Sequence, residues 1–146
     1  MRFLKLRSLF AFLLIIPFIN IVNSTREIPN LKPSNYVTLV VIVPESHADL
    51  LRKVMGDAGA GKTEYYSHGS FSIKGISRFT PQSGSHPFIG KEDQVETVIE
   101  ERIETVCSLE NLEKVIAAIK QAHPYEETII DIFPIYEIGW KKPELF

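Results

Sequence analysis

Apolar and polar residues along the chain follow two different periods, one of which predicts four strands. Residues 36–43 form a continuous β-branched run that ends at a proline, as is typical of a central strand. Residues 65–73 are rich in aromatic and β-branched side chains, and residues 92–107 alternate between apolar and polar over most of their length. The polar residues 100–102 interrupt this third strand, where we expect a bulge or an exposed extension. Residues 128–137 form the fourth predicted strand.

The second period is helical and predicts two amphipathic helices. The apolar face of the first helix consists of Leu51, Val54, Met55 and Ala58. The apolar face of the second helix consists of Leu112, Val115, Ile116 and Ile119. We expect Ser46, with Asp49 three residues later, to cap the first helix, and Ser108 to cap the second. The glycine-rich stretch from Gly59 should end the first helix.

The predicted order of elements is β-α-β-β-α-β, the split βαβ pattern of ferredoxin-like domains. We therefore expect an α+β fold in which two helices cover one face of an antiparallel four-stranded sheet. The other face of the sheet stays open, and another copy of the chain could pack against it. The domain should span residues 36–138 and be followed by a short tail, residues 139–146.

A basic and strongly apolar leader precedes this domain. Residues 1–24 contain three basic residues and no acidic one, and residues 9–22 are apolar except at two positions. This pattern is typical of a secretory signal peptide cleaved after Ser24, so we expect an exported protein, periplasmic or secreted, with residues 25–35 as a linker. The alternative is an uncleaved membrane anchor at residues 9–22, although a transmembrane helix needs about 20 apolar residues. Membrane contact is expected only in that case.

Charge and cysteine content exclude two classes of protein. The chain has a net charge of −2 and the leader contributes +3, so residues 25–146 carry −5. An acidic domain is a poor candidate for a nucleic-acid binder. Cys107 is the only cysteine, which excludes an internal disulfide, and its apolar surroundings predict a buried, unreactive thiol. Stability must therefore come from the core or from assembly with other copies.

Residues 56–63 match the phosphate-binding loop pattern G-x-x-x-x-G-K-[ST]. In nucleotide-binding proteins that loop follows a strand and opens a helix, whose N-terminus faces the phosphates. Here a predicted helix ends before the loop and a predicted strand follows it. We therefore interpret the segment as a glycine-rich end of a helix, and not as the site of a nucleotide hydrolase.

A short turn near the end of the chain concentrates chemically active side chains. His123, Tyr125, Glu126 and Glu127 place an imidazole, a phenol and two carboxylates within five residues. Such a set can bind a divalent cation through nitrogen and oxygen, or a small polar ligand. The alternative is a turn whose polar groups only satisfy the ends of a helix and a strand. The spacing shows no Ser-His-Asp or Cys-His set, so we predict no catalytic residue.

The segment 75–91 is a long predicted loop, and long loops inside compact domains are often functional. Its apolar side chains Phe79, Phe88 and Ile89 have two alternative roles. They can anchor the loop to a neighbouring subunit, or they can fasten it to the sheet of the same chain.

A collinear series of motifs resembles a known domain. The series includes Gly59-Ala60-Gly61-Lys62, Phe79-x-Pro81-x-x-Gly84, Pro87-Phe88-Ile89-Gly90, Arg102-Ile103-Glu104-Thr105 and Ala122-His123-Pro124-Tyr125-Glu126-Glu127. It resembles the domain inserted in bacterial Nif-three-like proteins (the NGG-one-interacting-factor family) and short stand-alone versions of that domain. The last motif is also similar to a turn of the CutA divalent-ion tolerance proteins.

The resemblance implies a ferredoxin-like domain of the PII/CutA type that assembles as a homotrimer. It also implies that the loop at 75–91 corresponds to the regulatory loop of PII signalling proteins. Full-length Nif-three-like proteins hold two metals on a flanking domain, so that metal site is not carried over to this chain. The chain departs from the usual insert at Ser67, Gly69, Ser77 and Thr128. These departures put a thiol-based role of the second strand in doubt.

We therefore predict a non-catalytic, exported domain that binds a small ligand or a divalent cation between subunits. The predicted ligand-binding residues are His123, Tyr125, Glu126 and Glu127, with Gly84 and Phe88 from the long loop. A metal ion, as the possible cofactor, would be held by His123 and Glu126, with His68 or His86 from a neighbouring subunit. The alternatives are an assembly module without a ligand, and a metal-dependent or nucleotide hydrolase.

Overall fold

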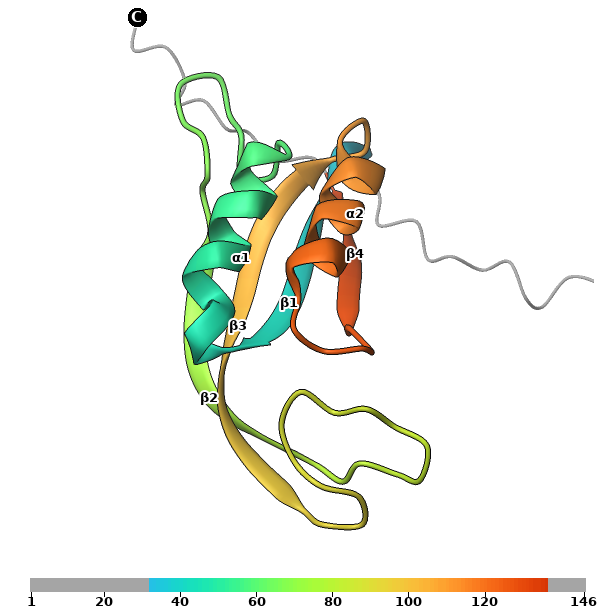
Figure 1. Ribbon diagram of the computed structural model, residues 1–146. Coiled ribbons are helices and arrows are strands. Elements are labelled where there is room, and N and C mark those ends of the chain that lie inside the picture. The colour runs from blue at the N-terminus through green and yellow to red at the C-terminus, as the bar shows by residue number, and fades with distance from the viewer. Residues whose placement is uncertain (1–31, 137–146) are drawn as a thin grey trace, which may run out of the picture. The chain divides into compact units, whose positions relative to one another are not determined.

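The chain folds in the predicted order β-α-β-β-α-β (Figure 1). The computed structural model describes residues 32–136, so the predicted leader, most of the linker and the tail lie outside the described residues. The elements are β1 (Pro33–Pro44), α1 (Glu45–Asp57), β2 (Phe71–Phe79), β3 (Glu96–Ser108), α2 (Leu112–Ala122) and β4 (Ile130–Tyr136). Among residues 32–136, no helix is long and apolar enough to cross a bilayer.

The four strands form one antiparallel sheet in the order β2-β3-β1-β4. The first strand, β1, is central because it pairs with β3 on one side and with β4 on the other. Both helices lie against the same face of this sheet (Figure 1). The predicted fold class, a ferredoxin-like α+β sandwich, is therefore confirmed.

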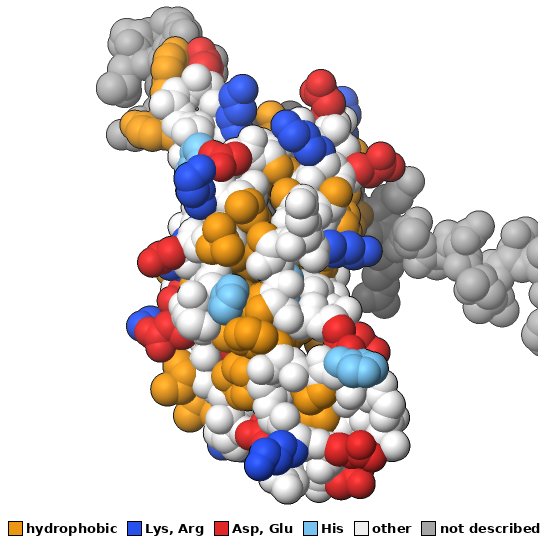
Figure 2. Space-filling view, in the orientation of Figure 1, with side chains coloured by type: hydrophobic (Ala, Val, Ile, Leu, Met, Phe, Trp, Pro, Cys, Tyr) orange, Lys and Arg blue, Asp and Glu red, His pale blue; other side chains and the backbone are white. Residues whose placement is uncertain are grey.

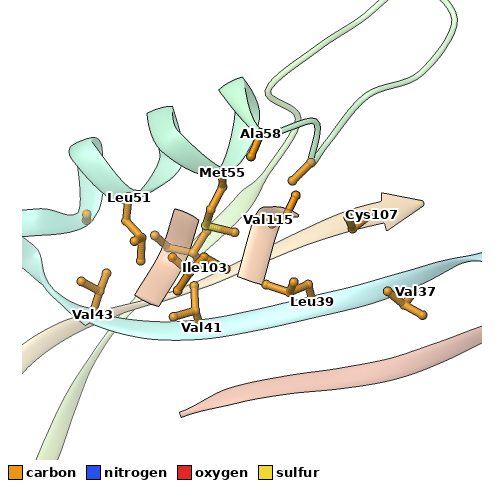
Figure 3. Packing of buried hydrophobic residues seen from close by; sticks show 13 residues of the cluster. Val37, Leu39, Val41, Val43, Leu51, Met55, Ala58, Ile103, Cys107 and Val115 are labelled. Atoms are coloured by element: carbon orange, nitrogen blue, oxygen red, sulfur yellow. The ribbon is translucent and has the colours of Figure 1, made fainter. Parts of the chain in front are cut away.

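The core lies between the two helices and the sheet (Figure 3). Every second residue of β1 points into it, because side chains alternate between the two faces of a strand. These residues and their helical partners are Val37, Leu39, Val41, Val43, Leu51, Met55, Val115 and Ile119. The apolar faces predicted from helical spacing thus do pack inward. Cys107 is buried at the same layer, and burial raises the pKa of its thiol, as expected of an unreactive cysteine.

The second strand begins at Phe71 and not near residue 65, so the aromatic residues before it belong to a loop. Tyr65 and Tyr66 are exposed in this loop. Backbone contacts hold its two ends together, since the Gly69 N–H donates to the Gly61 carbonyl over 2.9 Å. Short-range propensity predicted a strand here, but these tertiary contacts decide the conformation. The long loop predicted at residues 75–91 is displaced too, because β2 continues to Phe79 and β3 begins only at Glu96, so that the loop runs from residue 80 to 95.

The polar stretch in the third strand is neither a bulge nor an extension. Residues 100–102 pair without any register shift with β1 on one side and with β2 on the other. Glu100 and Glu101 are buried there because each has a partner: the Tyr125 hydroxyl for Glu100 and the Arg52 guanidinium for Glu101. Glu100 and Glu101 are therefore polar because each makes a buried contact, and the strand is regular at this place.

The predicted serine caps are also wrong. The residue at the N-cap of α1 is Pro44, and α1 has no side-chain cap. At α2 the N-cap residue is Asn111, whose N–H donates to the Ser108 hydroxyl over 3.4 Å. Ser108 thus stabilises the turn that leads into α2 without capping the helix itself.

Candidate functional site

A pocket of about 460 Å³ opens where three segments meet: the loop 80–95, the turn 123–129 between α2 and β4, and the adjoining end of the sheet. Figure 1 shows the loop and the turn at the same end of the domain. Apolar side chains gather at this end in Figure 2, with acidic and histidine side chains beside them. The lining residues that matter for its chemistry are Ile42, Arg78, Phe79, Phe88, Glu100, Tyr125, Glu126 and Glu127.

His123, the C-cap residue that follows α2, is not part of the pocket wall. It is buried, with Nε2 2.9 Å from the Ile42 carbonyl and Nδ1 3.1 Å from the backbone nitrogen of Tyr125. A carbonyl only accepts and a backbone N–H only donates, so the ring is neutral with its proton on Nε2. Burial lowers the pKa of His123, while the Ile42 carbonyl and the charge of Glu100 oppose this shift. Since both nitrogens have partners, this imidazole ties the turn to β1.

Tyr125 is the central side chain of the pocket. Its hydroxyl donates to Oε1 of Glu100 over 2.6 Å, and Glu100 is only 4% exposed. Burial, followed by the hydrogen bond to Glu100, raises the pKa of Tyr125 well above its ordinary value, so the phenol stays protonated. The ring centre of Tyr125 lies 5.9 Å from that of Phe79 and 6.4 Å from that of Phe88. These contacts make an aromatic wall with a buried carboxylate behind it.

The long loop is fastened to the turn of the same chain. The backbone N–H of His86 donates to Oε1 of Glu126 over 2.8 Å, and Nδ1 of His86 lies 3.9 Å from Oε2 of the same carboxylate. The ring of Phe88 packs edge-on against His47 at 5.2 Å, in addition to its contact with Tyr125. These contacts support the alternative in which the apolar residues of the loop fix it to its own domain.

The structure brings together part of the predicted ligand-binding set. Tyr125, Glu126, Glu127 and Phe88 line the pocket, whereas Gly84 turns the loop with a φ of +90° without forming part of the wall. Glu100 and Phe79 line the pocket as well but were not predicted as site residues. The signal for Glu100 was its acidic side chain within a strand pattern, which we interpreted as a bulge.

The four predicted metal ligands do not meet within one chain. His86 contacts Glu126, but His123 faces β1, and His68 lies in the loop between α1 and β2, where its Nε2 is 3.2 Å from Asp57 at the end of α1. Among residues 32–136, no group of three His, Cys, Asp or Glu side chains is arranged to hold a metal ion. A metal site of the predicted composition therefore requires residues from another subunit.

The segment that matches a phosphate-binding loop uses most of its backbone donors within the fold. It begins in the last turn of α1, and several of its backbone N–H groups are already bonded: Ala60 donates to Met55 and Gly61 to Val106. Gly61 adopts a φ of +64°, which favours glycine, and a Cβ on it would lie 2.1 Å from the Gly69 carbonyl oxygen. The glycines thus serve a close approach between two chain segments, in agreement with the interpretation from the sequence.

The same region contains a serine, a histidine and an aspartate in contact. His68 lies between the Ser67 hydroxyl, 3.0 Å away, and the Asp57 carboxylate. All three side chains are exposed, and the hollow beside His68 has no room for a water molecule. The structure therefore shows no cavity beside these three side chains that could hold a substrate.

Known proteins resemble the chain over about two thirds of its length. No family model matches. Proteins named GTP cyclohydrolase 1 type 2 homolog are 44% identical over 101 residues in Halalkalibacterium halodurans and 43% identical over 104 residues in Bacillus subtilis. The matches cover 69% and 71% of this chain, but only 27% and 28% of those proteins. The chain thus spans about a quarter of the length of the curated relatives it matches.

Solved structures give the same result. The Bacillus cereus protein related to NIF3 is 42% identical, with a TM-score of 0.60 over 72% of this chain and 26% of the other. The periplasmic divalent cation tolerance protein CutA from Archaeoglobus fulgidus is 18% identical, with a TM-score of 0.52 over 73% of this chain and 88% of the other, a likeness of fold alone. The chain therefore carries a NIF3-like domain with the CutA-like form of the ferredoxin-like fold.

Proposed function

We propose that this domain binds a small ligand in the pocket between the loop 80–95 and the turn 123–129, and that it is a regulatory, non-catalytic module. The observation that carries the proposal is the pocket itself. At about 460 Å³ it falls in the range of small-molecule sites, and a few polar groups converge on mostly apolar walls. Tyr125 stays protonated and both nitrogens of His123 are engaged, so these groups favour binding over acid–base chemistry.

The position of the loop supports a regulatory role. It is held by the hydrogen bond from His86 to Glu126 and by the packing of Phe88 against Tyr125, and Glu126, Phe88 and Tyr125 line the pocket. A ligand that changes these contacts also changes the loop, most of whose residues are exposed to solvent. CutA from Archaeoglobus fulgidus, which shares the fold, is a divalent cation tolerance protein, and this agrees with a role in sensing or handling small ligands.

A variant that fills the pocket tests this proposal. The full chain would be screened against copper, zinc, common nucleotides and a library of neutral, cationic and anionic metabolites, with chemical shifts of the turn 123–129 as the readout. We expect at least one compound to shift these signals, and Ser77→Phe, which places a ring in the pocket wall, to abolish the effect. Ser70→Phe adds the same ring just before the opposite end of β2, outside the pocket lining, and should leave the effect intact. If no compound of any class shifts these signals, or if Ser77→Phe leaves binding unchanged, the proposal is wrong.

We also propose that the domain assembles as a homotrimer, as the resemblance to CutA implies. Exposed apolar residues of the sheet support assembly, and they include Phe71, Ile73 and Phe133. By the strand register, these three side chains lie on the sheet face opposite the helices, since their partners Glu104, Arg102 and Thr38 alternate with core residues. Sedimentation of the purified chain should give three times the mass of one subunit, and a monomer would contradict the proposal.

Export by the leader remains a further proposal, supported only by its composition. Intact mass spectrometry of the protein isolated from its cells should show a chain that begins at Thr25. Recovery of a chain that still includes residues 9–22 from the membrane fraction would favour the anchor instead.

A further inference from the structure

We propose that the pocket selects a small organic cation with an apolar or aromatic body, such as an arylalkylammonium ion. This inference rests on the proposed function, because it names the class of ligand that the same pocket takes. It follows from two properties of the pocket, its aromatic wall and its charge.

The aromatic wall favours a cation with an apolar body. The rings of Phe79 and Phe88 flank Tyr125 at 5.9 and 6.4 Å between centres. The faces of such rings carry negative potential and attract ammonium groups, most strongly where water is excluded. Ile42 and Ile89 add aliphatic surface next to these rings. A ligand that fills this space must therefore have apolar surface of its own, which a hydrated metal ion lacks.

The charge of the pocket is negative. Three carboxylates line it, from Glu100, Glu126 and Glu127, against the single guanidinium of Arg78. Arg78, Glu126 and Glu127 are exposed, so water and salt screen their charges, whereas Glu100 is 4% exposed and its field is screened much less. The excess of negative charge therefore repels an anionic ligand and attracts a cationic one.

Glu100 is the buried carboxylate at the pocket, and it has no cationic partner among residues 32–136. The hydrogen bond that the structure gives it comes from a neutral phenol, and no ion pair joins Glu100 to a Lys or Arg among residues 32–136. Two other arginines of the domain are paired with other carboxylates, Arg52 with Glu101 and Arg102 with Glu104. A buried carboxylate without a cationic partner is costly, and a bound ammonium group at the pocket would offset that cost.

A series of three ligands of equal size and different charge tests the inference on the full chain. Benzylammonium, benzyl alcohol and benzoate would be titrated while the chemical shifts of Tyr125 and Phe88 are followed. We expect benzylammonium to bind at least about tenfold more tightly than benzyl alcohol, with an affinity that falls as salt is added, and benzoate not to bind. Equal binding of benzyl alcohol or benzoate overturns the inference, and so does the absence of any shift with benzylammonium.

Two exposed positions provide matched charge variants that should not disturb folding. Glu127→Gln removes a negative charge from the pocket and should weaken benzylammonium binding about fivefold, whereas Arg78→Gln removes the positive charge and should strengthen it by a similar factor. Changes in the same direction, or no change in either variant, would contradict a selection by charge.

The proposed function fails in a different way, namely if no compound of any charge binds the pocket. If a neutral or anionic compound from the library binds there instead, the selection of a cation is refuted, but the pocket is still a ligand-binding site.

Discussion

The hydrogen bond between Tyr125 and Glu100 allows the sharpest test of the site, by the substitution Tyr125→Phe. The phenylalanine ring keeps the contacts with Phe79, Phe88 and His123 and removes only the hydroxyl. Glu100 then keeps its burial but loses the donor that lies 2.6 Å from Oε1. A hydrogen bond to a charged group contributes about 1.5–3 kcal/mol to stability, and a buried charged group left without its donor belongs at the upper end of that range.

We therefore expect Tyr125→Phe to lower the free energy of unfolding by about 1.5–3 kcal/mol in urea titrations at pH 7. For a domain of this size the melting temperature should fall by about 4–8 °C per kcal/mol.

Tyr66→Phe is the matched control, because Tyr66 is 77% exposed and its variant should stay within about 0.5 kcal/mol of the wild type. A double-mutant cycle with Glu100→Gln should give a coupling energy between the two positions well above that of unrelated sites. If Tyr125→Phe is as stable as Tyr66→Phe at pH 7, the reasoning that links the buried carboxylate to the phenol is refuted.

Three further results are expected. The folded state holds His123 neutral and lowers its pKa, so the unfolded chain takes up the proton more readily. The free energy of unfolding should therefore fall as pH drops below about 6.5. The variant His123→Gln should lack this part of the pH dependence. Gly61→Ala should destabilise the domain by more than about 1–2 kcal/mol, since the φ of Gly61 is +64° and the new methyl group would collide with the Gly69 carbonyl. Gly75→Ala is the control: its methyl group meets nothing within 4 Å, so stability should change by less than about 1 kcal/mol. Met55→Ala, at a residue 2% exposed in the core, should cost about 2–5 kcal/mol in urea denaturation, and a loss below about 1 kcal/mol would contradict its place in the core.

Local patterns determined the order of the elements and the inward faces of both helices. The β-branched run at 36–43 lies within the central strand, and the residues at helical spacing, such as Leu51 and Val115, lie in the core. Such patterns are reliable because burying one face of an element is the main driving force for its formation. The collinear motifs likewise predicted the fold, which the comparisons confirm.

The residues at which helices and strands begin and end could not be predicted from local patterns and required the tertiary structure. The aromatic residues at 65 and 66 favoured a strand, but backbone bonds that join Gly61 to Gly69 and to Val106 keep this segment in a loop. Those bonds connect residues that are distant in the sequence, and propensity has no information about them. The start of β2 therefore depends on where β3 lies.

The composition of the pocket also depended on contacts across the fold. The sequence drew attention to the turn 123–127 through its density of polar side chains, but it assigned His123 to the ligand rather than to the carbonyl of Ile42. It gave no reason to join Glu100 to Tyr125, which is 25 residues away. A carboxylate within a strand pattern is predicted to be exposed unless a hydrogen-bond donor for it is known, because burying it without a partner is too costly. Only the folded chain supplies that donor, and so only the tertiary structure decided that the site is a negatively charged aromatic pocket.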